Sequence, residues 1–131
     1  EFRRVLFRSY PSEAISKLRD QLISGIKSSI PNALINTPKD SLPGIINVSF
    51  PGAKGETLLL LMDMEGIACS TGSACSAGVH RPSHVLLALG RSEDEAIGTL
   101  RFSLGAMSTE SDVQEVLRTL PSVVERARLA K

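Results

Sequence analysis

Cysteine, net charge and long apolar runs are all scarce in this sequence of 131 residues. Its two cysteines are too few for a disulfide-stapled scaffold, and they do not form a Cys-x-x-Cys pair. The longest continuous apolar run, 58–62, is too short to span a bilayer, and the first residues lack the features of a signal peptide. These absences argue against a disulfide-rich secreted scaffold or a membrane protein, and they favour a cytoplasmic protein with reduced thiols.

The net charge is close to zero, with 15 Lys and Arg against 14 Asp and Glu. We interpret residues 1–9 as a leader derived from an adapter or cloning sequence, and we expect a single domain at 10–131. Leaving the leader out removes three basic residues and one acidic residue, so 12 basic and 13 acidic residues remain. No basic stripe is then left to bind nucleic acid. The pair Gly52 and Gly55 is too closely spaced for a phosphate-binding loop.

Hydrophobic periodicity predicts alternating helices and strands in 10–131. The expected helices are 11–30, 56–65, 82–90, 92–98 and the segment after 109; the expected extended segments are 33–37, 45–50, 67–69 and 99–104. Pro121 should kink or restart the last helix, and the leucine run 58–61 should be buried around nearly its whole circumference. This order predicts an α+β domain in which a small, mostly antiparallel sheet carries helices on one face.

Alternation along the two longer strands separates two faces of the sheet. The residues expected to face the core are Ile46, Val48, Phe50, Leu100, Phe102 and Leu104. Arg101 must therefore point the other way, where its planar guanidinium could hold a carboxylate through two hydrogen bonds. The alternative for Arg101 is a solvated or ion-paired surface side chain.

Residues 70–78 form a run of nine small residues that contains a potential nucleophile, Cys75. Such a run is typical of a mobile loop that presents a thiol. No Lys, Arg or His lies within four residues of Cys75 to lower its pKa, so any activation must come from elsewhere. The alternative is a plain linker in which Cys75 is a small buried filler. Cys69, in an apolar segment, is expected in the core.

A zinc site built from Cys69, Cys75, His80 and His84 is a second hypothesis. The spacing is Cys-x5-Cys-x4-His-x3-His, whereas structural zinc sites prefer about two to four residues between their cysteines. Pro82 also separates the two histidines. The spacing therefore disfavours zinc, and we predict no metal site.

Four motifs in order resemble the carboxyl-terminal part of a cysteine desulfurase. They are Asn47-Val48-Ser49-Phe50, the run 70–78, Pro82–Gly90 and Arg101-Phe102-Ser103-Leu104-Gly105. Cysteine desulfurases are pyridoxal-phosphate enzymes of the class V aminotransferase type, and the resemblance is to their branch with the longer cysteine loop. It covers the chain from about residue 10 onward and implies the C-terminal small domain of a fold-type I pyridoxal-phosphate transferase.

The resemblance also implies roles for individual residues. Cys75 would be the catalytic nucleophile that takes sulfur from L-cysteine as a persulfide and leaves L-alanine. An iron–sulfur scaffold or a sulfur-carrier protein would then receive the sulfur. Arg101 would bind the substrate carboxylate, and the whole enzyme would be a homodimer.

One feature of the family pattern is missing from this sequence. The family's Schiff-base lysine lies upstream, and none of the lysines present (Lys17, Lys27, Lys39, Lys54 and Lys131) stands in its motif. We therefore expect a fragment that is inactive alone and has no covalent cofactor site. Three alternatives remain: a freestanding thiol carrier or interaction domain, a selenocysteine lyase, and a class V aminotransferase.

Overall fold

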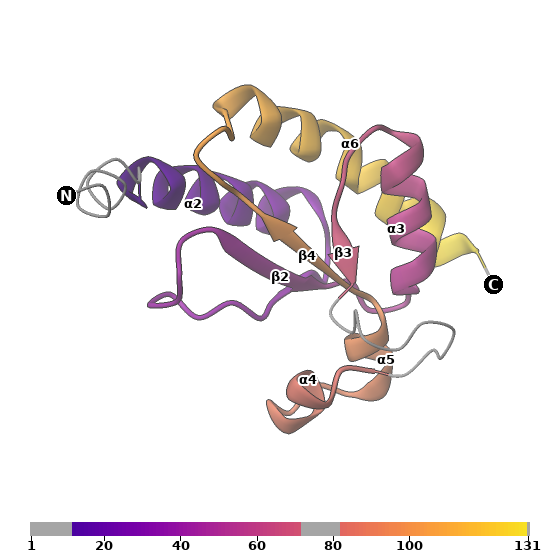
Figure 1. The fold of residues 1–131 in the computed structure, drawn as a ribbon. Coiled ribbons are helices and arrows are strands. Elements are labelled where there is room, and N and C mark those ends of the chain that lie inside the picture. The colour runs from indigo at the N-terminus through magenta and orange to yellow at the C-terminus, as the bar shows by residue number, and fades with distance from the viewer. Residues whose placement is uncertain (1–11, 72–81, 131) are drawn as a thin grey trace.

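The computed structural model describes residues 12–71 and 82–130, so the predicted leader at 1–9 lies outside the described residues. The elements are α2 (Ser12–Ser29), β1 (Leu34–Ile35), β2 (Ile45–Ser49), α3 (Gly55–Met64), β3 (Ser70–Thr71), α4 (His84–Ala88), α5 (Glu93–Ile97), β4 (Thr99–Ser103) and α6 (Glu110–Leu129). The strands form one sheet in the order β1-β2-β4-β3, and each neighbouring pair is antiparallel (Figure 1). The predicted α+β class and antiparallel sheet are confirmed.

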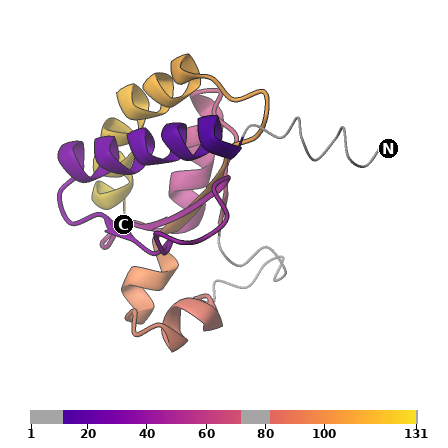
Figure 2. The same ribbon diagram turned by 90° about the vertical axis from the view of Figure 1, so that its left-hand side faces the viewer.

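Three long helices, α2, α3 and α6, cover one face of the sheet, whereas α4 and α5 lie on the other side (Figures 1 and 2). The prediction of helices on a single face is therefore right for the long helices and wrong for the two short ones. None of the helices in the described ranges is long and apolar enough to cross a membrane.

The hydrophobic core lies between the sheet and the three long helices. In the pairing of β2 with β4, Ile46 lies opposite Phe102 and Val48 opposite Leu100. These four side chains are at most 4% exposed, and Phe50 beyond the end of β2 is fully buried. The alternation predicted for both strands is confirmed, because residues opposite each other in an antiparallel pair share a face.

The packing of α2 against α6 depends on the glycine inside α2. A Cβ atom at Gly25 would lie 2.5 Å from both terminal methyl carbons of Leu117. The absence of a side chain therefore lets Leu117 of α6 sit directly on the backbone of α2. This close approach explains why a glycine occupies position 25, although glycine inside a helix costs about 1 kcal/mol relative to alanine.

The ends of three helices follow the expected chemistry. Ser92 and Glu95 form a reciprocal capping box at the start of α5, as Thr109 and Asp112 do at the start of α6. In each box a side-chain oxygen accepts from a backbone N–H that the helix leaves free. At the end of α3, Gly66 has a φ of 78°, a left-handed conformation that glycine adopts without steric cost.

Two helix predictions are corrected by the structure. Leu58 and Met62 of α3 are fully buried, but Leu60 is 61% exposed and Met64 is 69% exposed, so the helix is not buried all round. α3 lies at one side of the helical layer, where α6 and the sheet cover only part of its circumference (Figure 1). α6 continues through Pro121, so the predicted restart is wrong, whereas the predicted kink stays a prediction. Buried neighbours on both sides of Pro121, among them Leu120 and Val123, hold this part of the helix in the core.

The edge strand also differs from its prediction. The apolar segment 67–69 was expected to form it, but β3 is Ser70–Thr71, which pairs with Arg101 and Leu100 of β4. Ile67 and Cys69 instead pack as partly buried side chains against the core. The hydrophobicity of 67–69 correctly indicated that this segment packs against the core. Which residues form the edge strand depends instead on hydrogen bonding with β4.

Candidate functional site

The second face of the sheet carries a group of polar side chains. They are Asn47 and Ser49 of β2, Thr99 and Arg101 of β4, and Ser70 of β3; we call these five residues the polar face. Leu34 and Ile45, the cross-strand partners of Ser49 and Ser103, lie at its margin. Asn47 and Ser70 are the cross-strand partners of Arg101 on its two sides. Directly opposed residues have Cβ atoms about 4.5–5.5 Å apart. Arg101 therefore lies in the middle of a polar row that crosses three strands.

Arg101 has an unused hydrogen-bond donor. The residue is half-buried, and its Nε atom is buried without a hydrogen-bond partner in the described part of the chain. A buried N–H that donates to nothing costs free energy, so such groups are rare and are usually completed by water or by a ligand. The position predicted from alternation, on the face away from the core, is confirmed. Its role in binding a carboxylate remains a prediction.

A chain of hydrogen bonds surrounds this row. Nε of Arg91, between α4 and α5, donates to Oδ1 of Asn36 over 2.7 Å. Nδ2 of Asn36 in turn donates to Oδ1 of Asn47 and to Oγ of Ser49, each over 2.8 Å. The side chain of Arg91 is thus connected to the direct neighbour of Arg101 through a single amide.

A second branch continues into α5. The hydroxyls of Ser49 and Thr99 are 2.8 Å apart, and the Thr99 hydroxyl donates to the backbone carbonyl of Glu95 over 3.2 Å. Ser49 is fully buried and Thr99 is 2% exposed, so these hydrogen bonds lie away from solvent. The branch ties α5 to the sheet beside Arg101.

Sequence reasoning did not find Asn36 and Arg91 as members of this site. Both lie in irregular segments whose local pattern carries no signal, and 55 residues separate them. Asn47 was identified only as part of a motif. The polar positions that alternate with Ile46 and Val48 in β2 are the signal that could have pointed to it.

The predicted nucleophile, Cys75, lies outside the described residues, as does His80. The described chain leaves the sheet at Thr71, the end of β3, and resumes at Pro82 shortly before α4. In sequence, Cys75 therefore stands between an edge strand paired with Arg101 and the helix that precedes Arg91.

Cys69 is an unreactive thiol by comparison with an ordinary cysteine. It is partly buried and packs against the core, which confirms the core prediction. Burial first, and the nearby Asp63 carboxylate second, raise its pKa from 9.0 to about 11. Because thiolate is the nucleophilic form, these surroundings keep Cys69 protonated and inert near neutral pH.

The alternative zinc set is only half described. Cys69 packs against the core, while His84 is exposed at the first residue of α4. Within residues 12–71 and 82–130, no three His, Cys, Asp or Glu residues are grouped so that they could hold a metal ion.

The described lysines do not form a cofactor site. Lys17 and Lys27 are exposed on α2, a helix on the core side of the sheet, and Lys39 and Lys54 are exposed in connecting segments. None of the four is a member of the sheet, where Arg101 lies. The residues that the structure describes therefore provide no Schiff-base lysine beside the polar face, and they do not fit the covalent attachment of pyridoxal phosphate.

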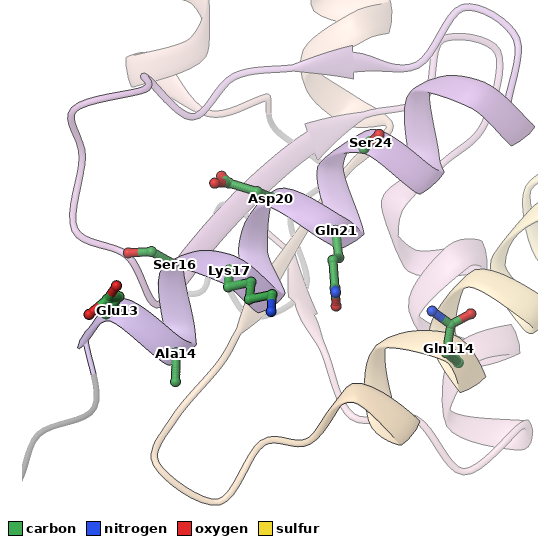
Figure 3. A pocket seen from close by; sticks show the side chains of 8 residues that line it. All are labelled: Glu13, Ala14, Ser16, Lys17, Asp20, Gln21, Ser24 and Gln114. Atoms are coloured by element: carbon green, nitrogen blue, oxygen red, sulfur yellow. The ribbon is translucent and has the colours of Figure 1, made fainter.

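A hollow between α2 and α6 is a separate feature (Figure 3). Its lining includes Lys17 and Gln21 of α2 and Gln114 of α6. It opens between helices that cover the opposite side of the sheet from the polar face (Figures 1 and 2). Neither Arg101 nor a cysteine lines it, so it is not the predicted reaction site.

Curated proteins named as cysteine desulfurases are similar to this chain over nearly its whole length. Cysteine desulfurase IscS of Clostridium botulinum (strain Hall) is 49% identical over 120 residues, which are 89% of this chain and 30% of that protein. An IscS-like cysteine desulfurase of Mycobacterium tuberculosis is 46% identical over 121 residues, which are 91% of this chain and 31% of that protein. The chain thus spans about 30% of the length of these curated relatives.

Structural similarity leads to the same group. A solved structure named as a NifS-like protein superposes with a TM-score of 0.74 at 34% identity, covering 88% of this chain and 28% of the other. The aminotransferase class-V family model matches residues 11–116, which include β2, β3, β4 and the polar face. By this match the chain belongs to the aminotransferase class V family.

Proposed function

We propose that residues 10–131 are the C-terminal small domain of a cysteine desulfurase. The observation that carries this proposal is Arg101, whose buried Nε–H has no partner among the described residues and lies in a polar row on the face away from the core. Such a donor suits a bound anion, and L-cysteine provides a carboxylate. The relatives named cysteine desulfurase, which match this chain at up to 49% identity, support the assignment.

In this proposal Arg101 binds and orients the substrate carboxylate. A guanidinium is always charged and presents its donors in a rigid plane that matches the two oxygens of a carboxylate. The position of Arg101 in the middle of a four-stranded sheet fixes the backbone that carries it. The fold thus fixes the place on the polar face from which the Arg101 side chain extends toward the substrate.

Cys75 is the proposed sulfur acceptor. Its thiolate forms a bond to the sulfur of L-cysteine while the carbon–sulfur bond of the substrate breaks. The carbon fragment keeps the electron pair of that bond and takes up a proton, which gives L-alanine, and Cys75 is left as a persulfide. Cys69 cannot replace it, because burial and Asp63 keep its thiol protonated.

The class V aminotransferase and cysteine desulfurase families depend on pyridoxal 5'-phosphate. Because the described lysines do not fit its attachment, the cofactor would be held by a part of the enzyme that precedes this domain. We further infer that the whole enzyme is a cytoplasmic homodimer. We also infer that the sulfur passes to an iron–sulfur scaffold or a sulfur-carrier protein.

Sulfide release from L-cysteine by the full-length enzyme tests the proposal. Cys75→Ser should abolish persulfide formation and sulfide release, whereas Cys69→Ser should leave both nearly unchanged and serves as the matched control. The 131-residue chain alone should show neither a lysine-linked cofactor absorbance band nor sulfide release.

The same measurement separates the alternatives. A class V aminotransferase would keep transamination activity in Cys75→Ala, because that reaction needs no sulfur nucleophile. Full-length protein that transfers sulfur only when another protein supplies it would be a thiol carrier. A strong preference for selenocysteine over L-cysteine would indicate a selenocysteine lyase. Each of these three results would contradict the desulfurase proposal.

A further inference from the structure

The hydrogen bonds around Asn36 have a fixed direction, which begins at Arg91. A guanidinium can only donate hydrogen bonds, so the atom of Asn36 that lies 2.7 Å from Nε of Arg91 must be the amide oxygen. The amide nitrogen of Asn36 is then the atom that faces Asn47 and Ser49, each over 2.8 Å. Arg91 thereby determines which way round the Asn36 amide stands.

The same reasoning orients Asn47. Because Asn36 donates to it, Asn47 must present its oxygen to Asn36, and its own Nδ2 takes the other branch of the amide. Asn36 directly follows β1, and β1 and β4 flank β2 on opposite sides. The Nδ2 group is then on the side of the amide away from Asn36, and β4, the strand that carries Arg101, flanks β2 on that side. No described residue accepts a hydrogen bond from it.

The far end of the network enforces the same direction. The backbone carbonyl of Glu95 can only accept, so Thr99 donates to it and leaves its oxygen to accept from Ser49. Ser49 in turn accepts from Asn36. A group that only donates, Arg91, stands at one end, and a group that only accepts stands at the other. Reversing one member would place a donor against a donor or an acceptor against an acceptor, away from solvent.

We propose that Arg91 and Asn36 are positioning residues that orient the Asn47 amide, so that its Nδ2 and Arg101 together bind the substrate carboxylate. This inference rests on the proposed function, and it extends the binding group from one residue to a pair with a defined support. With the amide reversed, Asn47 would present an oxygen next to Arg101 and would repel the carboxylate. The orientation of Asn47 thus distinguishes L-cysteine from an amino thiol without a carboxylate.

Two variants of the full-length enzyme reverse the network without removing it. In Arg91→Glu, residue 91 can only accept, so Asn36 must turn its nitrogen toward it and its oxygen toward Asn47. In Asn36→Asp, which is nearly isosteric, Arg91 is retained but Asn47 must donate toward residue 36. Both changes turn the oxygen of Asn47 toward Arg101. Arg91→Lys keeps a donor at residue 91, so this variant should retain most of the wild-type affinity for L-cysteine.

The experiment measures KM and kcat for L-cysteine together with the inhibition constant of cysteamine, which has the same amine and thiol but no carboxylate. Arg91→Glu and Asn36→Asp should raise KM about tenfold, the loss of one hydrogen bond to a charged group, while the inhibition constant of cysteamine stays close to wild type. Arg118→Glu is the matched control. Arg118 is exposed on α6 and pairs with Glu115, and this variant should leave KM unchanged.

Several outcomes would overturn the inference. If both reversing variants keep the wild-type KM, the Asn47 amide does not take part in binding. If KM and the cysteamine constant rise equally, or only kcat falls, the network has a general structural role. If Arg91→Glu fails to fold, Asn36→Asp and Arg91→Lys decide the question. A wild-type enzyme that releases no sulfide from L-cysteine would refute the proposed function itself, and this inference with it.

Discussion

The two faces of the central sheet have opposite compositions although the same strands form both. One face carries Ile46, Val48, Leu100 and Phe102, which are at most 4% exposed and pack under three long helices. The other is the polar face around Arg101, with the α4 and α5 segment on its side (Figure 2). The polar face is not simply solvent-exposed, since Ser49 and Thr99 are as buried as the core residues.

Burial has a different effect on each of the two faces. Apolar burial on the core face contributes about 25 cal/mol per Å² and holds the fold together. Burial on the polar face contributes little net free energy, because hydrogen bonds there mainly offset desolvation. What burial provides there is direction, because the hydrogen bonds that link Arg91, Asn36, Asn47, Ser49 and Thr99 each run from a defined donor to a defined acceptor. The buried Nε–H of Arg101 is left without a partner in the described part of the chain. Substitutions on the two faces and at their margins test this division.

Leu100→Ala should lower the free energy of unfolding by about 3 kcal/mol, because a fully buried leucine leaves a cavity in the core. Ser103→Ala, also on β4 but exposed on the opposite face, should change it by less than about 0.5 kcal/mol. Urea denaturation of the two variants measures the difference. Equal destabilisation by both would show that the two faces do not differ in their contribution to stability.

Gly98→Ala should destabilise the protein by about 1–3 kcal/mol, the usual range for overpacking. The added Cβ would lie 2.5 Å from the carbonyl oxygen of Phe50 and 2.6 Å from that of Ala53. Both are backbone atoms, and the Phe50 N–H also donates to the Gly98 carbonyl, so the clash cannot be relieved by rotating a side chain.

The matched control is Gly105→Ala, because nothing lies within 4 Å of a Cβ at that position. It should leave the thermal midpoint nearly unchanged. If Gly98→Ala proved equally harmless, the junction between α5 and β4 would not be as tightly packed as the structure indicates.

Arg101→Met should separate function from stability on the polar face. Removing the guanidinium should raise KM for L-cysteine about tenfold to a hundredfold, the loss of one or two hydrogen bonds to a charged group. The melting temperature should stay the same or rise slightly, because the variant removes a buried Nε–H that has no described partner. A loss of stability comparable to that of Leu100→Ala would show that Arg101 is mainly structural.

Cys69 should be the less reactive of the two cysteines. With its pKa raised to about 11, its thiolate fraction at pH 8 is about a hundredfold below that of a thiol with the ordinary value of 9.0. Iodoacetamide followed by peptide mass spectrometry should therefore modify Cys75 first in the native protein. Faster labelling of Cys69 would contradict its protected position.

The same pKa shift predicts a small dependence of stability on pH. Between pH 9 and pH 11 the unfolded chain loses the Cys69 proton before the folded chain does, so stability should fall as pH rises through this window. Thermal unfolding over that range should be less pH-dependent in Cys69→Ala than in the wild type. An identical pH profile would show that the thiol titrates normally in the folded state.

Much of the fold follows from local patterns in the sequence. The alternation through Ile46, Val48 and Phe50 correctly predicted both a strand and its buried face, and the capping box at Thr109 correctly located the start of α6. These features depend on residues close in sequence, whose side-chain period and backbone hydrogen bonds are fixed by local geometry. The outward position of Arg101 followed from the same period.

Local sequence patterns thus specify the element types, the face on which Arg101 lies and the family motifs around it. Contacts between distant segments specify that β3 is formed by Ser70 and Thr71, that α3 leaves Leu60 exposed, and that α6 continues through Pro121. They also bring Arg91 to Asn36, 55 residues away. The physical reason is that strand pairing, burial and hydrogen-bond direction depend on partners from distant segments, which no local pattern specifies.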